Sequence, residues 1–407
     1  MPATYPQWIE RIARSLERSE RVCLGLMSGT SANGIDVAIC RAIGSVETGT
    51  TGVKLLYSGV AEYPEDLRER IQRGSLSLDT RGVAELHGAI GEAFADAAQR
   101  ALKTAQIAAR ELDVVGSHGQ TVYHHSRRPG VARVTLQLGD GDRIAARLGA
   151  PVFFDFRARD VALGGEGAPL TPYTDRILYG GVTGRAVLNL GGIANLTFLA
   201  DRRERITGFD VGPANAPLDR IARRLTEDRE SYDKDGELAR RGTVVKKLLD
   251  ELCVGDEFVK LAPPKSTGFE SYGDEFVESL ARRYGGPVDV HVLRTVIEFE
   301  AWAIVDALTR FVPAGLPPVK ELIIAGGGAE NPVLIGALTE RCYTMGIVVR
   351  RSEELDIPSA AREALAFAVL AHEALLGQQT SLPAVTGASH GAVLGKLCLP
   401  PILSGGV

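Results

Sequence analysis

Cysteine and long apolar runs are scarce in this chain of 407 residues, and each scarcity excludes a class of protein. There are five cysteines, and no two of them stand in a CxxC pair: Cys23, Cys40, Cys253, Cys342 and Cys398. This spacing argues against a zinc site or a disulfide framework and predicts reduced core cysteines in a cytosolic protein. No run of about 18 apolar residues occurs, so we expect no membrane-spanning helix.

Positive charge is not in excess either. The formal net charge is −5, whereas a nucleic-acid-binding surface needs a basic footprint, so we expect no nucleic-acid partner. Residues 1–21 are charged and amphipathic and lack the apolar core of a secretion signal, which points to the cytoplasm. A hydrophobic content of 45% and a charged content of 24% are typical of a globular protein, here of two or three domains.

Asparagine is also rare, and its placement is informative. The chain has Asn33, Asn189, Asn195, Asn215 and Asn331, and all of them lie in or beside turns that contain glycine. Asparagine tolerates left-handed backbone, which explains part of this pattern. Many other turns of the chain use glycine, aspartate or serine instead, so we interpret these asparagines as markers of a binding site.

The strongest positive feature is a hairpin over residues 22–43. Two apolar strands flank a glycine-rich turn, residues 28–34, that offers backbone N–H groups and the hydroxyls of Thr30 and Ser31 to an anion. An ordinary tight hairpin needs only a two-residue turn, so the long turn favours phosphate binding. The GxxxxGK[ST] pattern is absent, so the turn is not a P-loop.

The second half of the chain repeats this order. Residues 186–199 form another strand, glycine turn and strand, and each half continues with a third strand, a helix and a strand followed by a polar or glycine turn. Alternating strands and helices predict an α/β fold with the ligand at the carboxyl ends of the strands, clamped between the halves. We expect lobes at residues 1–184 and 185–380, and a tail at 381–407 that packs back on the body.

Two motifs of the second half are typical of nucleotide sites. Asp210 follows a strand beside Gly212, where a carboxylate can hold Mg²⁺ near phosphates, although a turn or helix-capping aspartate fits equally well. Gly326, Gly327 and Gly328 follow a buried strand and let the chain pass flat against a planar group such as adenosine. Glycine-rich turns of this kind are common, so this second signal is weak by itself.

Candidate catalytic groups gather in the first half. Asp160 precedes a glycine loop at 164–170, and a carboxylate beside a phosphoryl acceptor can act as a base, although a surface ion-pair cluster is the alternative. His118, with Gln120 and Thr121, follows a buried strand; we favour a sugar-binding edge over a satisfied turn histidine. Glu363 opens an apolar helical run, where a glutamate that suits the helix dipole is the simpler explanation.

Taken together, the motifs resemble those of the anhydro-N-acetylmuramic acid kinases, a branch of the actin-like sugar-kinase superfamily. The resemblance runs from about residue 24 to residue 396 and is carried by GLMSGTSANGIDVAI, GSHGQTV, DFRARDVALGGEGAPL, LNLGGIANLTF, GFDVGPAN, AGGGAENP and EALAFA. It implies a duplicated actin-like (ribonuclease H-like) ATPase fold, with two lobes and a nucleotide cleft between them. It also implies ATP with Mg²⁺ and a combined hydrolase and kinase reaction on a small sugar substrate, and it is compatible with a homodimer.

The resemblance also assigns roles to residues. Asp160 takes the position of the catalytic base, and Asp210 and Glu363 take positions near Mg²⁺. Implied nucleotide contacts are Gly29, Thr30, Ser31, Asn33, Gly191, Gly192, Asp210, Gly212, Asn215, Gly326, Gly327, Gly328 and Asn331. Implied sugar contacts are His118, Gln120, Thr121, Arg157 and Glu166.

The chain departs from the family pattern at several of these places. Asn33 replaces an aspartate, Glu166 a glutamine and Phe269 an arginine; Val211 and Ala214 replace threonine and glycine. Residues 171–176 lack a histidine often found there. Two alternatives therefore stay open: a kinase for another sugar, such as levoglucosan or a hexose, and a catalytically silent nucleotide- or sugar-binding protein. The intact Asp160 and Asp210 speak against the silent protein.

Overall fold

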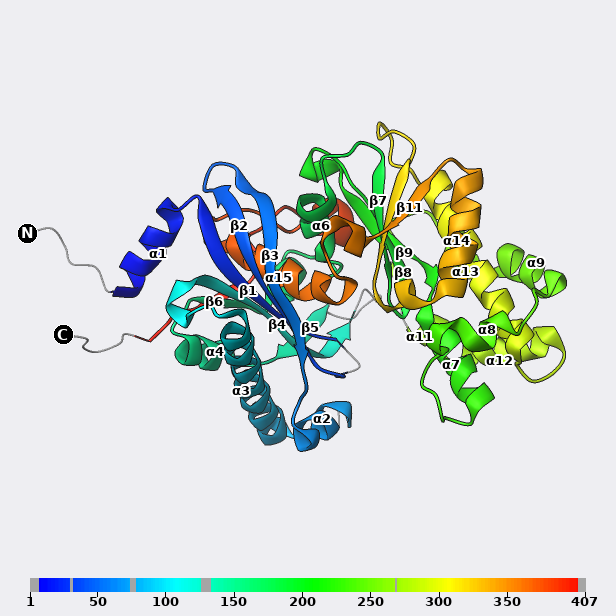
Figure 1. The fold of residues 1–407 in the computed structure, drawn as a ribbon, viewed down its shortest axis with the longest axis horizontal. Coiled ribbons are helices and arrows are strands. Elements are labelled where there is room, and N and C mark those ends of the chain that lie inside the picture. Colours follow the sequence, from blue (N-terminus) through cyan, green and yellow to red (C-terminus); the bar gives the residue numbers. More distant parts are fainter. Residues whose placement is uncertain (1–6, 30–31, 74–77, 126–132, 268, 402–407) are drawn as a thin grey trace, which may run out of the picture. The chain divides into compact units, whose positions relative to one another are not determined.

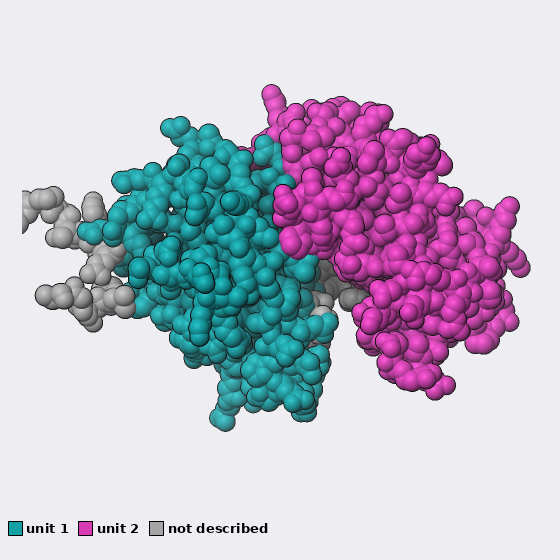
Figure 2. Space-filling model, in the orientation of Figure 1, with its two compact units in different colours: residues 1–178, 360–407 teal, residues 179–359 magenta. Residues whose placement is uncertain are grey.

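Two compact units make up the chain in the computed structural model, which describes residues 7–29, 32–73, 78–125, 133–267 and 269–401. Residues 1–178 and 360–407 form the first unit, and residues 179–359 form the second (Figure 2). The observed boundary after residue 178 differs from the expected one after residue 184. Residues 360–380, which we expected in the second lobe, belong to the first unit.

The first unit contains a seven-stranded sheet in the order β12-β6-β4-β1-β2-β3, with β5 beside β4. Its strands are β1 (Glu20–Ser28), β2 (Ile35–Ser45), β3 (Gly49–Ala61), β4 (Leu112–His125), β5 (Val134–Leu138), β6 (Val152–Phe154) and β12 (Lys396–Cys398). Strands β1, β2 and β3 form an antiparallel meander, and β4 and β6 continue the sheet parallel to β1. Strand β12 pairs with β6, so residues 396–398 pack on the sheet of the first unit.

The second unit repeats this topology with five strands in the order β11-β10-β7-β8-β9. They are β7 (Arg185–Leu190), β8 (Ile193–Phe198), β9 (Thr207–Pro213), β10 (Glu321–Ala325) and β11 (Val348–Arg351). Strands β7, β8 and β9 form the meander, and β10 and β11 follow in parallel. The α/β class and the duplicated actin-like arrangement are therefore confirmed.

Helices cover both sheets (Figure 1). The first unit has α1 (Gln7–Glu17), α2 (Glu65–Gln72), α3 (Thr80–Ala105), α4 (Gly141–Leu148), α5 (Phe156–Ala162), α6 (Thr171–Tyr179), α15 (Arg362–Leu375) and α16 (Pro383–Thr386). The second has α7 (Asn215–Thr226), α8 (Glu237–Arg240), α9 (Lys246–Gly255), α10 (Glu257–Lys260), α11 (Phe269–Tyr272), α12 (Asp274–Tyr284), α13 (Val290–Arg310) and α14 (Pro332–Thr344). No helix among the described residues is long and apolar enough to cross a membrane.

Helix α15 lies unusually close to the first sheet. Along β1, Leu24 and Leu26 join the core cluster that contains α3, so Gly25 between them faces the opposite side of the sheet. A Cβ added to Gly25 would overlap the carbonyl oxygen of Ala364, and one added to Gly116 of β4 would overlap that of Phe367. The backbone of α15 therefore rests directly on the backbones of two strands.

Strand β4 is longer than the sequence indicated. We expected it to end at Gly116, with residues 117–121 as a turn; instead it continues to His125 because β5 supplies a partner for the extra residues. The positive φ of 76° at Gly119 marks the irregularity that the glycine permits. All five cysteines are free, and Cys253 is the one that is not fully buried.

The close approach of α15 predicts a steep penalty at Gly25. We expect Gly25→Ala to lower the free energy of unfolding by ~1–3 kcal/mol or more, because neither backbone can yield without disturbing the sheet. Gly336→Ala is the matched control, since its Cβ would meet open space in the middle of α14. That variant should gain ~0.5–1 kcal/mol from helix propensity. Urea unfolding of both variants checks the contrast, and a neutral Gly25→Ala would contradict it.

Candidate functional site

Asp160 is completely buried and its carboxylate is held by three donors. Oδ2 accepts the backbone N–H of Gly167 at 2.8 Å, and Oδ1 accepts the hydroxyls of Thr386, at 2.7 Å, and of Ser381. A carboxylate has about four lone-pair positions, so one stays available on Oδ2. The three donors hold the carboxylate in a fixed orientation. Ser381 and Thr386 come from the C-terminal segment, and the sequence analysis did not assign them a role.

The glycine loop after α5 wraps around this carboxylate. The N–H of Gly165 donates to the backbone oxygen of Asp160 at 2.9 Å, and a Cβ on Gly165 would overlap Oδ2. Gly167 has a φ of 72°, which favours glycine. The glycines of the motif therefore let the loop close over Asp160, which supports the sequence-based link between the loop and this aspartate.

The buried His118 and the partly buried Arg157 form a pair beside Asp160. Nε of Arg157 donates to Nε2 of His118 at 2.9 Å, and Nδ1 of His118 lies 2.9 Å from the carbonyl oxygen of Gly119. The histidine is thus neutral with its proton on Nδ1, and burial together with the charge of Arg157 lowers its pKa well below the ordinary value. Burial lowers the pKa of Arg157 to about 10, and the charges of Glu363 and Asp160 oppose that shift. Both are expected sugar contacts; those roles stay predictions.

Gln120, Thr121 and Glu166 all make contacts within the first unit. The Gln120 amide accepts from Ser28 at 2.7 Å and donates to the backbone oxygen of Gly29 at 3.0 Å. The hydroxyl of Thr121 accepts from Gln137 at 3.3 Å, and Glu166 lies 3.5 Å from Arg133. Gln120 is 1% exposed, so its polar atoms mainly tie β4 to the first hairpin. A sugar contact by any of the three stays a prediction.

A half-buried carboxylate that the sequence analysis missed lies near Glu363. Burial and the charge of Glu363 together raise the pKa of Asp36 to about 6. The charges of Glu363 and Asp160 also act on Arg157, so Glu363 influences both Asp36 and this guanidinium. Asp36 stands two residues after Gly34 in the first hairpin motif, and this adjacency was the available signal.

The first glycine turn is described only in part. The N–H of Ala32 donates to the carbonyl oxygen of Gly29 at 3.0 Å, and Ala32 has a φ of 50°. Asn33 is exposed at the end of the turn. Thr30 and Ser31, the expected hydroxyl donors, lie outside the described residues, as does the side chain of Phe269.

Three turns of the second unit meet at the ends of its strands. The carbonyl oxygens of Gly191 and Gly192 accept backbone N–H groups at the start of α7, at 3.0–3.1 Å, including that of Asn215. A Cβ on Gly326 would lie 2.7 Å from the backbone oxygen of Leu190, and one on Gly328 would lie 2.9 Å from Oδ1 of Asn215. The structure thus brings the predicted glycine and asparagine motifs of this unit into contact.

Asn331 has a structural role at the same place. Its side-chain oxygen accepts the N–H groups of Val333, at 3.0 Å, and Leu334, at 3.3 Å, which caps the start of α14. Gly327 is exposed beside it, so the turn over residues 326–331 offers a glycine surface at the helix start. Adenosine binding at this turn stays a prediction.

Asp210 lies in the middle of β9, not after a strand as the sequence indicated; it pairs with Asn195, directly beside the register irregularity between Ala194 and Asn195. Its Oδ1 accepts from Asn195 at 2.9 Å, and its Oδ2 accepts the hydroxyl of Ser266 at 2.7 Å and the N–H of Thr267 at 2.9 Å. An oxygen donor of this kind fits Mg²⁺, which proteins bind through one or two carboxylates together with substrate phosphates. Within the described part of the chain, no three His, Cys, Asp or Glu residues gather as a metal cage.

Comparisons with known proteins found relatives over nearly the whole chain. A family model described as anhydro-N-acetylmuramic acid kinase matches residues 21–400. A protein of that name from Caldanaerobacter subterraneus subsp. tengcongensis is 36% identical over 96% of this chain and 100% of its own length. One from a strain of Bacillus cereus is 37% identical over 93% and 99%. Among solved structures, a ROK hexokinase from Thermus thermophilus covers 85% of this chain and 98% of its own, at 16% identity and a TM-score of 0.33.

The raised pKa of Asp36 predicts a pH-dependent effect on stability. Its folded-state pKa of about 6 exceeds the ordinary value of 3.8, so the folded protein favours the protonated form. The ionised carboxylate therefore lowers stability progressively as pH rises from about 4 to about 6, and the loss is complete above that range. We expect Asp36→Asn to raise the melting temperature most near pH ~8 and little near pH ~4.

Thermal unfolding across that pH range checks this expectation. Glu85→Gln, an exposed position on α3, is the control and should shift the melting temperature little at any pH. A gain for Asp36→Asn that does not depend on pH contradicts the assignment.

Proposed function

The chain belongs to the anhydro-N-acetylmuramic acid kinase family, and from this premise we propose that it opens 1,6-anhydro-N-acetylmuramic acid with water and phosphorylates the freed 6-oxygen from ATP. The product is N-acetylmuramic acid 6-phosphate, and the reaction serves the recycling of cell-wall sugars in the cytoplasm. The observation that carries the proposal is the caged carboxylate of Asp160 inside the glycine loop of the family motif.

In this mechanism Asp160 is the base. The free lone pair on Oδ2 accepts a proton from water, and the water oxygen bonds to the anomeric carbon of the sugar. The bond from that carbon to the 6-oxygen breaks, and the 6-oxygen takes its electron pair. It then attacks the γ-phosphorus in line, and ADP leaves. The donors from Gly167, Ser381 and Thr386 keep Asp160 oriented while its charge changes.

The other site residues bind and orient. Arg157, held by His118, brings a guanidinium beside Asp160, where it counters the negative charge of the neighbouring carboxylates. Asp210 and Glu363 are the proposed carboxylates toward Mg²⁺, which when bound neutralises charge on the β- and γ-phosphates. The turns of the second unit over residues 190–194 and 326–331 face the nucleotide.

One observation favours a second candidate, a kinase for an uncharged anhydro sugar such as levoglucosan. The muramic substrate carries a lactyl carboxylate that needs a cation. Arg133 stands by the Asp160 loop but lies 3.5 Å from Glu166, where the family usually has glutamine. The carboxylate of Glu166 therefore offsets the charge of this guanidinium, which suits a neutral sugar better than an anionic one.

Release of ADP from Mg-ATP tests the proposal directly. We expect release with 1,6-anhydro-N-acetylmuramic acid and none without sugar, and a fall of at least ~10²-fold in Asp160→Asn, because the amide cannot take the proton. Asp155→Asn is the control. That carboxylate lies in the same segment but forms an ion pair with Lys396, so its loss should leave turnover near the parent value.

The sugars tested beside it decide between the candidates. Release with levoglucosan or glucose alone keeps the kinase and changes the substrate. Binding of ATP without release with any sugar contradicts the proposed reaction and favours the silent binding protein.

A further inference from the structure

Helices α6 and α15 are joined by a fully buried ion pair. Nε of Arg362 donates to Oδ1 of Asp175 at 3.0 Å, and Nη2 donates to Oδ2 at 2.6 Å. The two side chains are 2% and 0% exposed. Two parallel donors to one carboxylate fix direction as well as distance, so this contact allows little sliding or rotation of one helix against the other.

Each partner is attached directly to one part of the reaction centre. Arg362 immediately precedes Glu363 at the start of α15. Asp175 lies in α6, which begins at Thr171, directly after the loop whose Gly167 N–H binds Asp160. The ion pair therefore links the Glu363 carboxylate to the loop around Asp160 through a short path of ordered residues.

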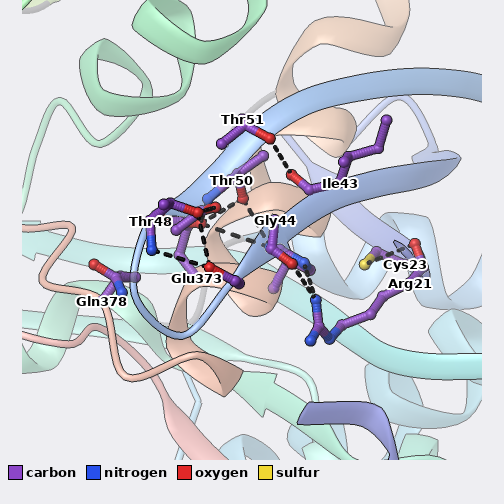
Figure 3. Close-up of polar contacts among 12 residues, drawn as sticks. Arg21, Cys23, Ile43, Gly44, Thr48, Thr50, Thr51, Glu373 and Gln378 are labelled. Carbon is purple, nitrogen blue, oxygen red and sulfur yellow. Dashed lines mark hydrogen bonds and ion pairs between the residues drawn. The ribbon is translucent and has the colours of Figure 1, made fainter. Parts of the chain in front are cut away.

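The opposite end of α15 is also fixed. Glu373 accepts the hydroxyl of Tyr173, also of α6, and both the hydroxyl and the backbone N–H of Thr50. Burial alone would raise the pKa of Glu373, but these hydrogen bonds and that of His372 outweigh it, so the carboxylate stays ionised. Figure 3 shows Glu373 pointing to the residues around Thr50, with Arg21 bound to the backbone of Gly44 nearby.

The contacts along α15 hold the helix in a single position against the sheet of the first unit. The carbonyl groups of Ala364, in its first turn, and of Phe367 lie against Gly25 and Gly116, and its C-terminal end is held through Glu373. The pair with Asp175 adds a two-point side-chain contact at that first turn, which fixes its rotation relative to α6. A small displacement of that turn moves Glu363 against Asp36 and Arg157, where the charges are close enough to influence one another.

We propose that the buried Arg362–Asp175 ion pair is a positioning element of the reaction centre, which fixes the Glu363 carboxylate relative to the loop around Asp160. This inference rests on the proposed function for its effect on turnover. A stability role alone is a poor explanation for the pair, since replacing a buried ion pair by apolar residues of similar size is often neutral or stabilising. The pair touches no expected substrate contact, so it acts through its neighbours.

The test separates position from stability with two variants. In Arg362→Met/Asp175→Leu both charges are removed and the space stays filled, so we expect a melting temperature close to that of the parent. In Arg362→Lys the charge stays but the two parallel donors are lost. Both variants should lose ~10- to 100-fold in kcat, while KM for ATP and for the sugar stays within about threefold, because misplacement by about 1 Å acts on the chemical step.

The control is Arg185→Met/Glu321→Leu, which removes another well-buried pair, 9% and 12% exposed, from the starts of β7 and β10 in the second unit. It should leave kcat near the parent value. Full kcat in Arg362→Lys overturns the proposal, and so does full kcat in a stable double variant. If the double variant does not fold, Arg362→Lys alone decides.

A second measurement needs no substrate. Hydrogen exchange at the Gly167 amide, which donates to Asp160, reports on the loop itself. We expect at least ~10-fold faster exchange there in both variants and no change at the buried Val114 near the start of β4. Unchanged exchange at Gly167 overturns the proposal. A parent protein that turns over no sugar contradicts the proposed function instead, and the exchange result still decides the positioning role.

Discussion

The first unit depends on direct contact between the backbone of α15 and two parallel strands. Gly25 and Gly116 make that contact, because any side chain at either position would meet a helix carbonyl group. Close packing then leaves the helix little freedom, and polar contacts at its two ends hold what remains. Since α15 begins at Arg362, the same constraint determines where Glu363 lies. The packing of α15 in the core therefore also determines where the charge of Glu363 lies in the proposed site.

Several residues that look like ligand contacts in the sequence serve the scaffold in the structure. Gln120 ties a strand to a turn, His118 accepts a hydrogen bond from Arg157, and Asn331 caps a helix. A polar group buried without a partner is costly, so side chains near a site first satisfy the backbone around it. In this protein such contacts fix the shapes of the turns that a ligand meets. A motif residue therefore shapes the site even where it does not touch the ligand.

The sequence predicted local features well and distant ones poorly. Both hairpins, the order of strands and helices, and the link between Asp160 and its glycine loop follow from periodicity and turn residues. The extension of β4 could not be predicted, because it depends on β5 as a partner. The roles of Ser381 and Thr386 were also missed, since more than 200 residues separate them from Asp160. Asp36 was missed because its environment depends on Glu363, which is even more distant along the chain.

The two units differ in continuity along the chain. The second is a single stretch, residues 179–359, whereas the first combines both ends. During synthesis the second unit can therefore fold while the first still lacks α15, β12 and the hydroxyls around Asp160. The nascent chain has Asp160, the proposed base, and the glycine loop early, yet the carboxylate acquires its full set of donors only after Thr386 has left the ribosome. Until then the proposed reaction centre is incomplete, so any activity of the nascent chain has to wait for a segment made more than 200 residues after Asp160.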